Sequence, residues 1–319
     1  MKLLTAAKRL STQTAYASAL KVFDLFWARA GIGGSPFPLS HATELRFVTW
    51  LSVEHPVRSS TAAQYLSAVR SHSMLSSGPV SAEHVSLAVK GMANLEAVCE
   101  PKPVKQTWLA SYVMGAASKL LVLLAAPSPP LVDCQALVAS IVGFLFLSRA
   151  STVCAIRPVD FSVVGATLLF CERYRKSKQV PSSRTLQLRL DSSSPAWSVV
   201  EYCSFLRKHH PDLIEQSIIS FFPQAYPAAR VDACLGVACR LLGDDGPGLC
   251  PWSSHALRRG GAVSMLAVGV PLIKICEWGH WSGESSIRPY IVDRAFQCPS
   301  PADSVCFEWL VGTNRSIFD

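Results

Sequence analysis

The sequence predicts a mainly helical fold with a small β-hairpin, divided between two domains. At 319 residues the chain is longer than one hydrophobic core usually organises, which favours two domains of roughly 100 to 200 residues each. Half of the residues are apolar and only 16% are charged, so the chain is able to bury large cores. Apolar residues recur at helical spacing along most of its length, with one β-prone interruption.

Four amphipathic helices are expected in the first hundred residues. Apolar side chains there repeat every three to four positions, and glycine- and proline-rich segments separate the periodic stretches. The expected helices cover 11–27 with Ser11 and Thr12 as N-caps, 44–51, the residues after Ser60 and Thr61, and the residues after Ser81. Residues 1–98 are therefore predicted to form a compact helical domain.

A linker is expected at 99–107, because CEPKPVKQT combines two prolines and two lysines with no apolar period. The second predicted domain, 108–319, is again mostly helical. Within it, Leu131–Ser148 is the most apolar stretch and predicts a buried helix. The β-prone runs at 167–170 and 185–190 flank a polar turn and predict a hairpin.

The composition narrows the class of protein further. The formal net charge of +8 favours an anionic partner, nucleic acid or a membrane surface, without choosing between them. Lys8 and Arg9 interrupt the apolar start before it reaches the length of a signal sequence, so secretion is not expected. Eleven scattered cysteines without a CxxC pair predict reduced, mostly buried thiols.

Two segments bring cations to the middle of the chain. Arg149 ends the apolar helix, where a buried guanidinium needs an anionic partner; a surface arginine at a helix end is the alternative. The predicted hairpin turn carries Arg173, Arg175, Lys176 and Lys178. Such a turn is either simply solvated or a flexible finger that reaches phosphates, and its lysine could protonate a leaving oxygen.

Two further segments near the C-terminus carry polar groups suited to chemistry. Ser253 or Ser254 is expected to cap a helix with His255 and Arg258 on one face near its start, while Arg259 is expected to point elsewhere. An HxxR pair on a helix surface is also common without a function. His280 and Trp281 follow a glycine, and Tyr290 comes ten residues after His280. A tyrosine near a helix end is otherwise a core or rim residue.

Other kinds of site lack their sequence signals. The eight histidines form neither an HExxH motif nor a Cys/His set at zinc-finger spacing, so no metal site is expected. The glycine patterns of phosphate-binding loops and dinucleotide folds are also missing, so no nucleotide cofactor is expected.

Taken in order, the arginine, the hairpin lysine, HxxR, Gly–His and the tyrosine resemble the tyrosine recombinase (phage integrase) family along nearly the whole chain. HALRRGGA and GHWS followed by RPYI are most similar to the recombinases of eukaryotic mobile elements. The resemblance implies an N-terminal helical core-binding (SAM-like) bundle at 1–98 that clamps DNA. It also implies a catalytic α+β domain at 108–319.

The resemblance further implies site-specific cutting and rejoining of DNA through a 3′-phosphotyrosyl intermediate, without cofactor or metal. Double-stranded DNA would be the partner, with a homo-tetramer assembled on two DNA sites, in the nucleus of a eukaryote or otherwise in the cytoplasm or nucleoid. The alternatives are an inactive or domesticated DNA-binding protein and, more remotely, a type IB topoisomerase. The implied catalytic residues are Arg149, Lys178 (or Lys176), His255, Arg258, His280 and the nucleophile Tyr290, and the expected DNA contacts are Lys102, Lys105, Arg175 and Lys176.

Three positions depart from the family pattern. Thr152 stands where an acidic residue usually follows the first arginine, so another group must steady Arg149. The interval from Gly–His to the tyrosine is one residue longer than usual. Pro289 directly precedes Tyr290 and is expected to keep Arg288 out of a helix.

Overall fold

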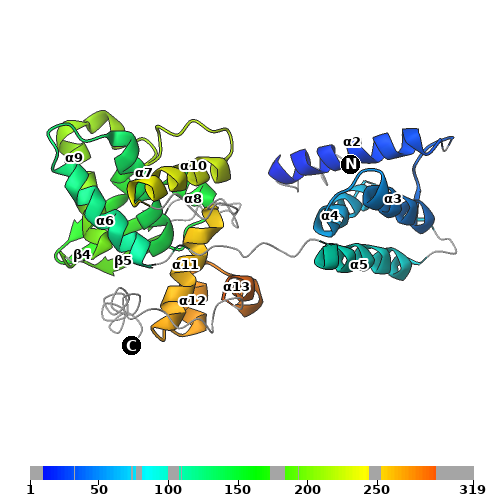
Figure 1. The fold of residues 1–319 in the computed structure, drawn as a ribbon. Coiled ribbons are helices and arrows are strands. Elements are labelled where there is room, and N and C mark those ends of the chain that lie inside the picture. The colour runs from blue at the N-terminus through cyan, green and yellow to red at the C-terminus, as the bar shows by residue number, and fades with distance from the viewer. Residues whose placement is uncertain are drawn as a thin grey trace. The chain divides into compact units, whose positions relative to one another are not determined.

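A computed structural model of the chain describes residues 10–31, 33–72, 75–76, 81–99, 108, 110–172, 184–192, 194–243 and 253–291. The chain divides into two compact units, Met1–Pro103 and Val104–Asp319 (Figure 1). The expected linker at 99–107 lies outside the described residues except for Cys99, which ends a helix.

The first unit is built from the four helices that the periodicity predicts. They are α2 (Leu10–Arg29), α3 (His41–Val53), α4 (Ser59–Arg70) and α5 (Ala82–Cys99), with a two-residue parallel pairing of β1 (Leu39–Ser40) and β2 (Leu75–Ser76). The N-caps predicted for the first helix are wrong, because Ser11 and Thr12 lie inside α2, and α4 begins at Ser59 and not after Ser60 and Thr61. At α4 a side chain of another helix replaces the local cap, since both the backbone N–H and the hydroxyl of Ser59 donate to Glu96 of α5.

Aromatic rings and one buried carboxylate hold the first unit together. Phe23 and Phe47 are fully buried and meet edge to face, with ring centroids 5.1 Å apart. Glu44 is also fully buried, and it accepts hydrogen bonds from Arg70 at 2.6 and 2.8 Å and contacts Nδ1 of His41 at 2.8 Å. Burial acts to raise the pKa of Glu44, but Arg70 and His41 outweigh it, so the pKa is lowered.

The second unit surrounds one apolar helix, α7 (Leu131–Leu145). Every residue from 134 to 145 is buried, and α7 packs against α6, α9, α10 and α11, which confirms the predicted buried helix (Figure 1). None of the helices in the described ranges is long and apolar enough to cross a membrane. The other helices are α6 (Ala110–Leu124), α8 (Ala150–Ala155), α9 (Pro195–His209), α10 (Pro227–Leu241), α11 (Ser254–Ala267), α12 (Leu272–Gly279) and α13 (Glu284–Ile291), with short 3-10 turns at Pro158–Asp160 and Pro211–Leu213.

A three-stranded antiparallel sheet interrupts the helices in the order β3 (Phe161–Val164), β4 (Thr167–Glu172) and β5 (Arg184–Arg189). The pair β4 and β5 is the predicted hairpin. Strand β3 was not predicted, because it has only four residues and three of them are exposed. The hairpin turn, 173–183, lies outside the described residues.

Candidate active site

The site begins where α7 ends. Leu147 adopts a left-handed backbone conformation with φ of 48°, which is costly for a non-glycine residue and is held here by its buried side chain. The chain then turns so that Arg149 becomes the N-cap residue of α8. The guanidinium of Arg149 is half-buried and donates through Nη2 to the carbonyl of His280 at 3.4 Å.

Helix α11 starts with a cap that the sequence did not reveal. Ser253 is the N-cap residue but makes no side-chain capping bond. Instead, the backbone N–H of Ser254 donates to Oδ1 of Asp232, on α10, at 2.5 Å. Burial raises the pKa of Asp232, although the Ser254 hydrogen bond and the nearby His255 act to lower it. The carboxylate thus fixes the start of the helix that presents His255.

Arg258 lies one turn further along α11 and is 3% exposed. Its Nη1 donates to the carbonyl of Leu147, and its Nη2 donates to the carbonyl of Gly279 at 2.5 Å. The guanidinium also lies over the ring of Trp281, with Cζ 3.8 Å from the ring centroid. Two chain segments that meet only in the fold therefore hold this cation in place.

Opposing effects act on the charge of Arg258. Burial, and then the positive charge of Arg149, lower the pKa of Arg258 below its usual value, while Tyr290 and Glu172 act in the opposite direction. Two neighbouring guanidinium groups, one buried and one half-buried, gain from a bound anion, and their planar forks match tetrahedral oxyanions.

Arg259 does not point away from the site, and this expectation was wrong. It is 6% exposed, and its Cζ lies 5.9 Å from the ring centroid of Tyr290, close to the 6.0 Å measured for Arg258. Helix geometry explains the error, because positions i+3 and i+4 lie on either side of residue i. Arg258 and Arg259 therefore both lie on the face of α11 that carries His255.

Helix α12 ends in a tight turn that delivers His280. His280 has φ of 54°, the second non-glycine left-handed residue in the described part of the chain, and its Nε2 lies 3.1 Å from Oε2 of Glu172. The preceding Gly279 is required, because a Cβ atom there would lie 1.9 Å from the Trp281 ring. The Gly–His–Trp sequence thus fixes the turn, the histidine and the ring beneath Arg258.

Tyr290 lies on α13, which runs through Pro289 from Glu284 to Ile291. The expectation that Arg288 leaves the helix was wrong: the proline removes one backbone donor in a two-turn helix, while Ile287 and Ile291 bury their side chains. The phenol oxygen of Tyr290 is 3.2 Å from Nδ1 of His255. Its ring meets Trp281 edge to face at 5.4 Å.

The structure thus brings together Arg149, His255, Arg258, His280 and Tyr290, which span 142 positions of the sequence. Arg258 is buried, Tyr290 is half-buried and His255 is exposed, so the phenol and the imidazole lie toward solvent. Such an arrangement can bind an oxyanion beside a hydroxyl that has a base within hydrogen-bonding distance.

Several predicted residues lie outside the described part of the chain: Lys102, Lys105, Arg173, Arg175, Lys176 and Lys178. Among the residues that are described, no group of three or more His, Cys, Asp or Glu side chains could hold a metal ion. Glu172 and Asp232 belong to the site but were not predicted, since each comes from a different element than its partner and no local spacing links them.

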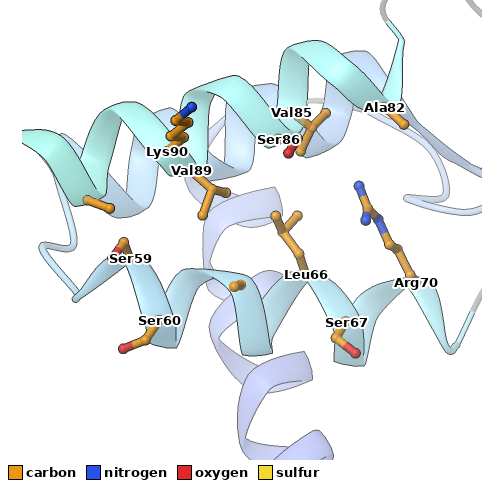
Figure 2. Close-up of a pocket in the computed structure, with 12 residues that line it drawn as sticks. Ser59, Ser60, Leu66, Ser67, Arg70, Ala82, Val85, Ser86, Val89 and Lys90 are labelled. Atoms are coloured by element: carbon orange, nitrogen blue, oxygen red, sulfur yellow. The ribbon is translucent and has the colours of Figure 1, made fainter. Parts of the chain in front are cut away.

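A groove of about 580 Å³ lies between α4 and α5 in the first unit (Figure 2). Serine and alanine residues form much of its lining, and its two cations are Arg70 and Lys90. The Arg70 guanidinium is held by the buried Glu44. The groove therefore presents mainly small side chains beside a guanidinium that an ion pair holds in place.

Solved structures decide the kind of fold. A lambda integrase dimer bound to a COC′ core site matches with a TM-score of 0.56 and 14% identity, over 92% of this chain and 93% of that one. XerH site-specific recombinase bound to a palindromic difH substrate matches with a TM-score of 0.60 and 13% identity, over 93% and 79%. The chain has the tyrosine recombinase fold. A Tn1549 transposon integrase in complex with transposon right end DNA extends the match to 97% of this chain and 98% of that one, with a TM-score of 0.55 and 9% identity.

No protein-family model and no curated protein sequence matches the chain. The tyrosine recombinase fold is therefore identified by comparison of structures, at sequence identities of 9–14% where comparison of sequences finds no match. The match to these structures extends over most of the chain, which is mainly helical with a small three-stranded antiparallel sheet.

Proposed function

We propose that the protein is a site-specific DNA recombinase or integrase that cuts and rejoins DNA strands through a 3′-phosphotyrosyl intermediate. The observation that supports this most is the Tyr290 hydroxyl, 3.2 Å from His255 and beside the buried guanidinium of Arg258. The fold likeness to DNA-bound recombinases points to the same substrate. The motif style suggests a mobile element of eukaryotes as the source.

The scissile phosphate would be held by Arg149, Arg258 and His280. An arginine has five N–H donors, and the two carbonyls that hold Arg258 accept from two of them, so further donors remain for phosphate oxygens. These donors are fixed before DNA binds, and they stabilise the charge that grows on the non-bridging oxygens. Arg149 joins this group through its bond to the His280 carbonyl.

Tyr290 would attack the phosphorus, and His255 would accept the phenol proton through Nδ1. The new phosphotyrosyl ester replaces the broken phosphodiester, and a free 5′ hydroxyl is released. Rejoining is the reverse reaction, in which a 5′ hydroxyl attacks the same phosphorus and the phenol leaves. Because the ester bond is conserved, neither a metal nor a nucleotide is needed.

The proton for the departing 5′ oxygen would come from Lys178, with Lys176 as the alternative, in the turn between β4 and β5. These lysines are proposed from their position in the sequence. Strands β4 and β5 start and end this turn, and β4 carries Glu172, which contacts His280. Strand β4 thus ends next to the site.

DNA binding would use phosphate contacts from Lys102, Lys105, Arg175 and Lys176, together with the helices of the first unit acting as a clamp. Such contacts release counterions, so the affinity is expected to fall steeply with added salt. Exchange of strands needs two DNA sites, and we propose a homo-tetramer assembled on them.

The test uses duplexes that the protein itself enriches from a randomised DNA pool. A single 5′-bridging phosphorothiolate is placed at successive positions along the enriched site, because a thiol leaves readily and rejoins poorly. The wild-type protein is expected to form an adduct that survives denaturation at one position per strand. The Tyr290→Phe variant should bind the same DNA with unchanged affinity and form none.

The same substrates separate the alternatives. Retained binding without any adduct supports an inactive DNA-binding protein. Relaxation of supercoiled plasmid by a monomer, without strand exchange between two sites, supports a type IB topoisomerase. A Lys178→Ala variant should cleave the phosphorothiolate far better than the ordinary phosphodiester, because a thiolate needs no proton; the Lys176→Ala variant serves as its matched control.

A further inference from the structure

Glu172 is a buried carboxylate that faces the cations of the site from a strand. It is the last residue of β4, on the buried face of that strand, and is 7% exposed. Its Oε2 lies 3.1 Å from Nε2 of His280, across 108 positions of sequence. Carboxylates are seldom this buried unless they are paired.

The contact fixes the histidine ring. An ionised carboxylate has only acceptors, so Nε2 carries the proton and donates it to Glu172. Nδ1, on the other side of the ring, can then donate to a phosphate oxygen only when the ring carries a second proton, and the carboxylate stabilises the cation so formed. The backbone of His280 is held as well, since its carbonyl accepts from Arg149 and its left-handed conformation follows Gly279. Ring and backbone are therefore both positioned without DNA.

The carboxylate also lies where the neighbouring helix lacks an acid. Thr152 of α8, one turn after Arg149, carries no charge, and Thr152 and Glu172 line the same cavity of about 10 Å³. That space is about the size of one water molecule at most. Glu172 thus reaches the start of α8 from the sheet. Its charge favours the protonated form of Arg258, which burial and Arg149 disfavour.

We propose that Glu172 is a positioning residue of the strand-cleavage reaction: it orients the His280 ring toward the phosphate and balances the guanidinium charges of the site. This inference rests on the proposed function. Removal of the charge is expected to slow the chemical step and not the binding of DNA, because Glu172 contacts His280 and would not contact the substrate.

The test compares Glu172→Gln with Glu277→Gln. Both changes remove one negative charge at nearly constant shape, but Glu277 is 60% exposed on α12 and pairs with Lys274. Single-turnover cleavage of the phosphorothiolate duplex should fall about 10- to 100-fold in Glu172→Gln. Its DNA dissociation constant should stay within about threefold, and Glu277→Gln should match the wild type in both.

A second measurement does not depend on activity. In the 1H–15N spectrum of the DNA-free protein, with assignment by His280→Gln, the Nε2 proton of His280 should be protected from solvent exchange in the wild type and in Glu277→Gln. The protection should fall in Glu172→Gln, because a neutral amide oxygen is a weaker acceptor than a carboxylate.

The outcomes distinguish the two proposals. Failure of the wild-type protein to form an adduct would rule out the proposed function. The protection of the His280 Nε2 proton would still test the contact with Glu172. Active wild-type protein with equal or faster cleavage by Glu172→Gln overturns the positioning role, and faster cleavage would mean that the carboxylate competes with the phosphate. An unprotected His280 proton in the wild type overturns the contact itself.

Discussion

The change Gly261→Ala tests whether α11 lies against the end of α7 as closely as the site requires. A Cβ atom at Gly261 would lie 2.4 Å from the backbone oxygen of Phe144 and 2.3 Å from Cδ2 of Leu147. Ordinary contacts of a Cβ atom begin at 3.4 Å, so α11 must retreat by about 1 Å. The Leu147 side chain is buried, and a backbone oxygen cannot rotate away.

Two effects of known size follow from that retreat. Overpacking in a core costs about 1–3 kcal/mol of the free energy of unfolding, and contact with a backbone oxygen favours the upper end. Arg258 lies three residues earlier on the same helix and donates to the Leu147 carbonyl. A displacement of about 1 Å at a catalytic group typically costs about 100-fold in rate, so DNA cleavage should fall by that factor.

Gly236→Ala is the matched control. Gly236 also lies inside a helix, α10, but the nearest atom to its added Cβ is Nη1 of Arg240 at 3.8 Å, the mobile end of a side chain. This variant should gain up to about 1 kcal/mol from helix propensity. Urea unfolding followed by tryptophan fluorescence measures both. Equal stability changes in the two variants would refute the close approach of α11 to α7.

Three further predictions concern charge. Because the pKa of Glu44 is lowered in the folded protein, the unfolded chain binds the Glu44 proton more readily. The stability that Glu44 contributes is therefore full above about pH 4.5 and is lost as the pH falls through the lower pKa of the folded state. Glu44→Gln should cost about 1.5–3 kcal/mol of the free energy of unfolding at pH 7 and remove this acid dependence, as measured in urea titrations. Arg258→Ala should reduce single-turnover cleavage about 100- to 1000-fold with duplex affinity nearly unchanged in a gel-shift assay, whereas equal loss of both would remove its assigned role. Burial raises the pKa of the Cys203 thiol to about 12, so iodoacetamide should leave it unmodified in the native protein and label it only in urea, as read by mass spectrometry.

Local patterns were sufficient for most of the fold. Helical periodicity located the four helices of the first unit, and the apolar run at 131–148 located the central helix of the second. Strand β3 escaped because four residues with one buried side chain carry no period. The starts of α2 and α4 were misplaced, since at α4 Glu96 of another helix supplies the cap.

The candidate site, like the fold, was predictable from the sequence only in part. His255, Arg258, His280 and Tyr290 stand in short motifs whose spacing is visible in the sequence, and the structure brings them together with Arg149. Their supporting groups come from elsewhere: Glu172 from a strand, Asp232 from the preceding helix, and the Leu147 and Gly279 carbonyls from two backbone turns. Contacts of that kind depend on tertiary packing, which no local spacing encodes.

Tyr290 is the proposed nucleophile at phosphorus, and identification of the residue that carries DNA tests this role most directly. The adduct formed on the phosphorothiolate duplex is digested with nuclease and trypsin, and the peptides are sequenced by mass spectrometry. The peptide 275–294 is expected to carry a 3′-linked nucleotide on Tyr290. Attachment to another residue, such as the exposed Tyr226, or a DNA-bound native protein that carries no nucleotide, would contradict it.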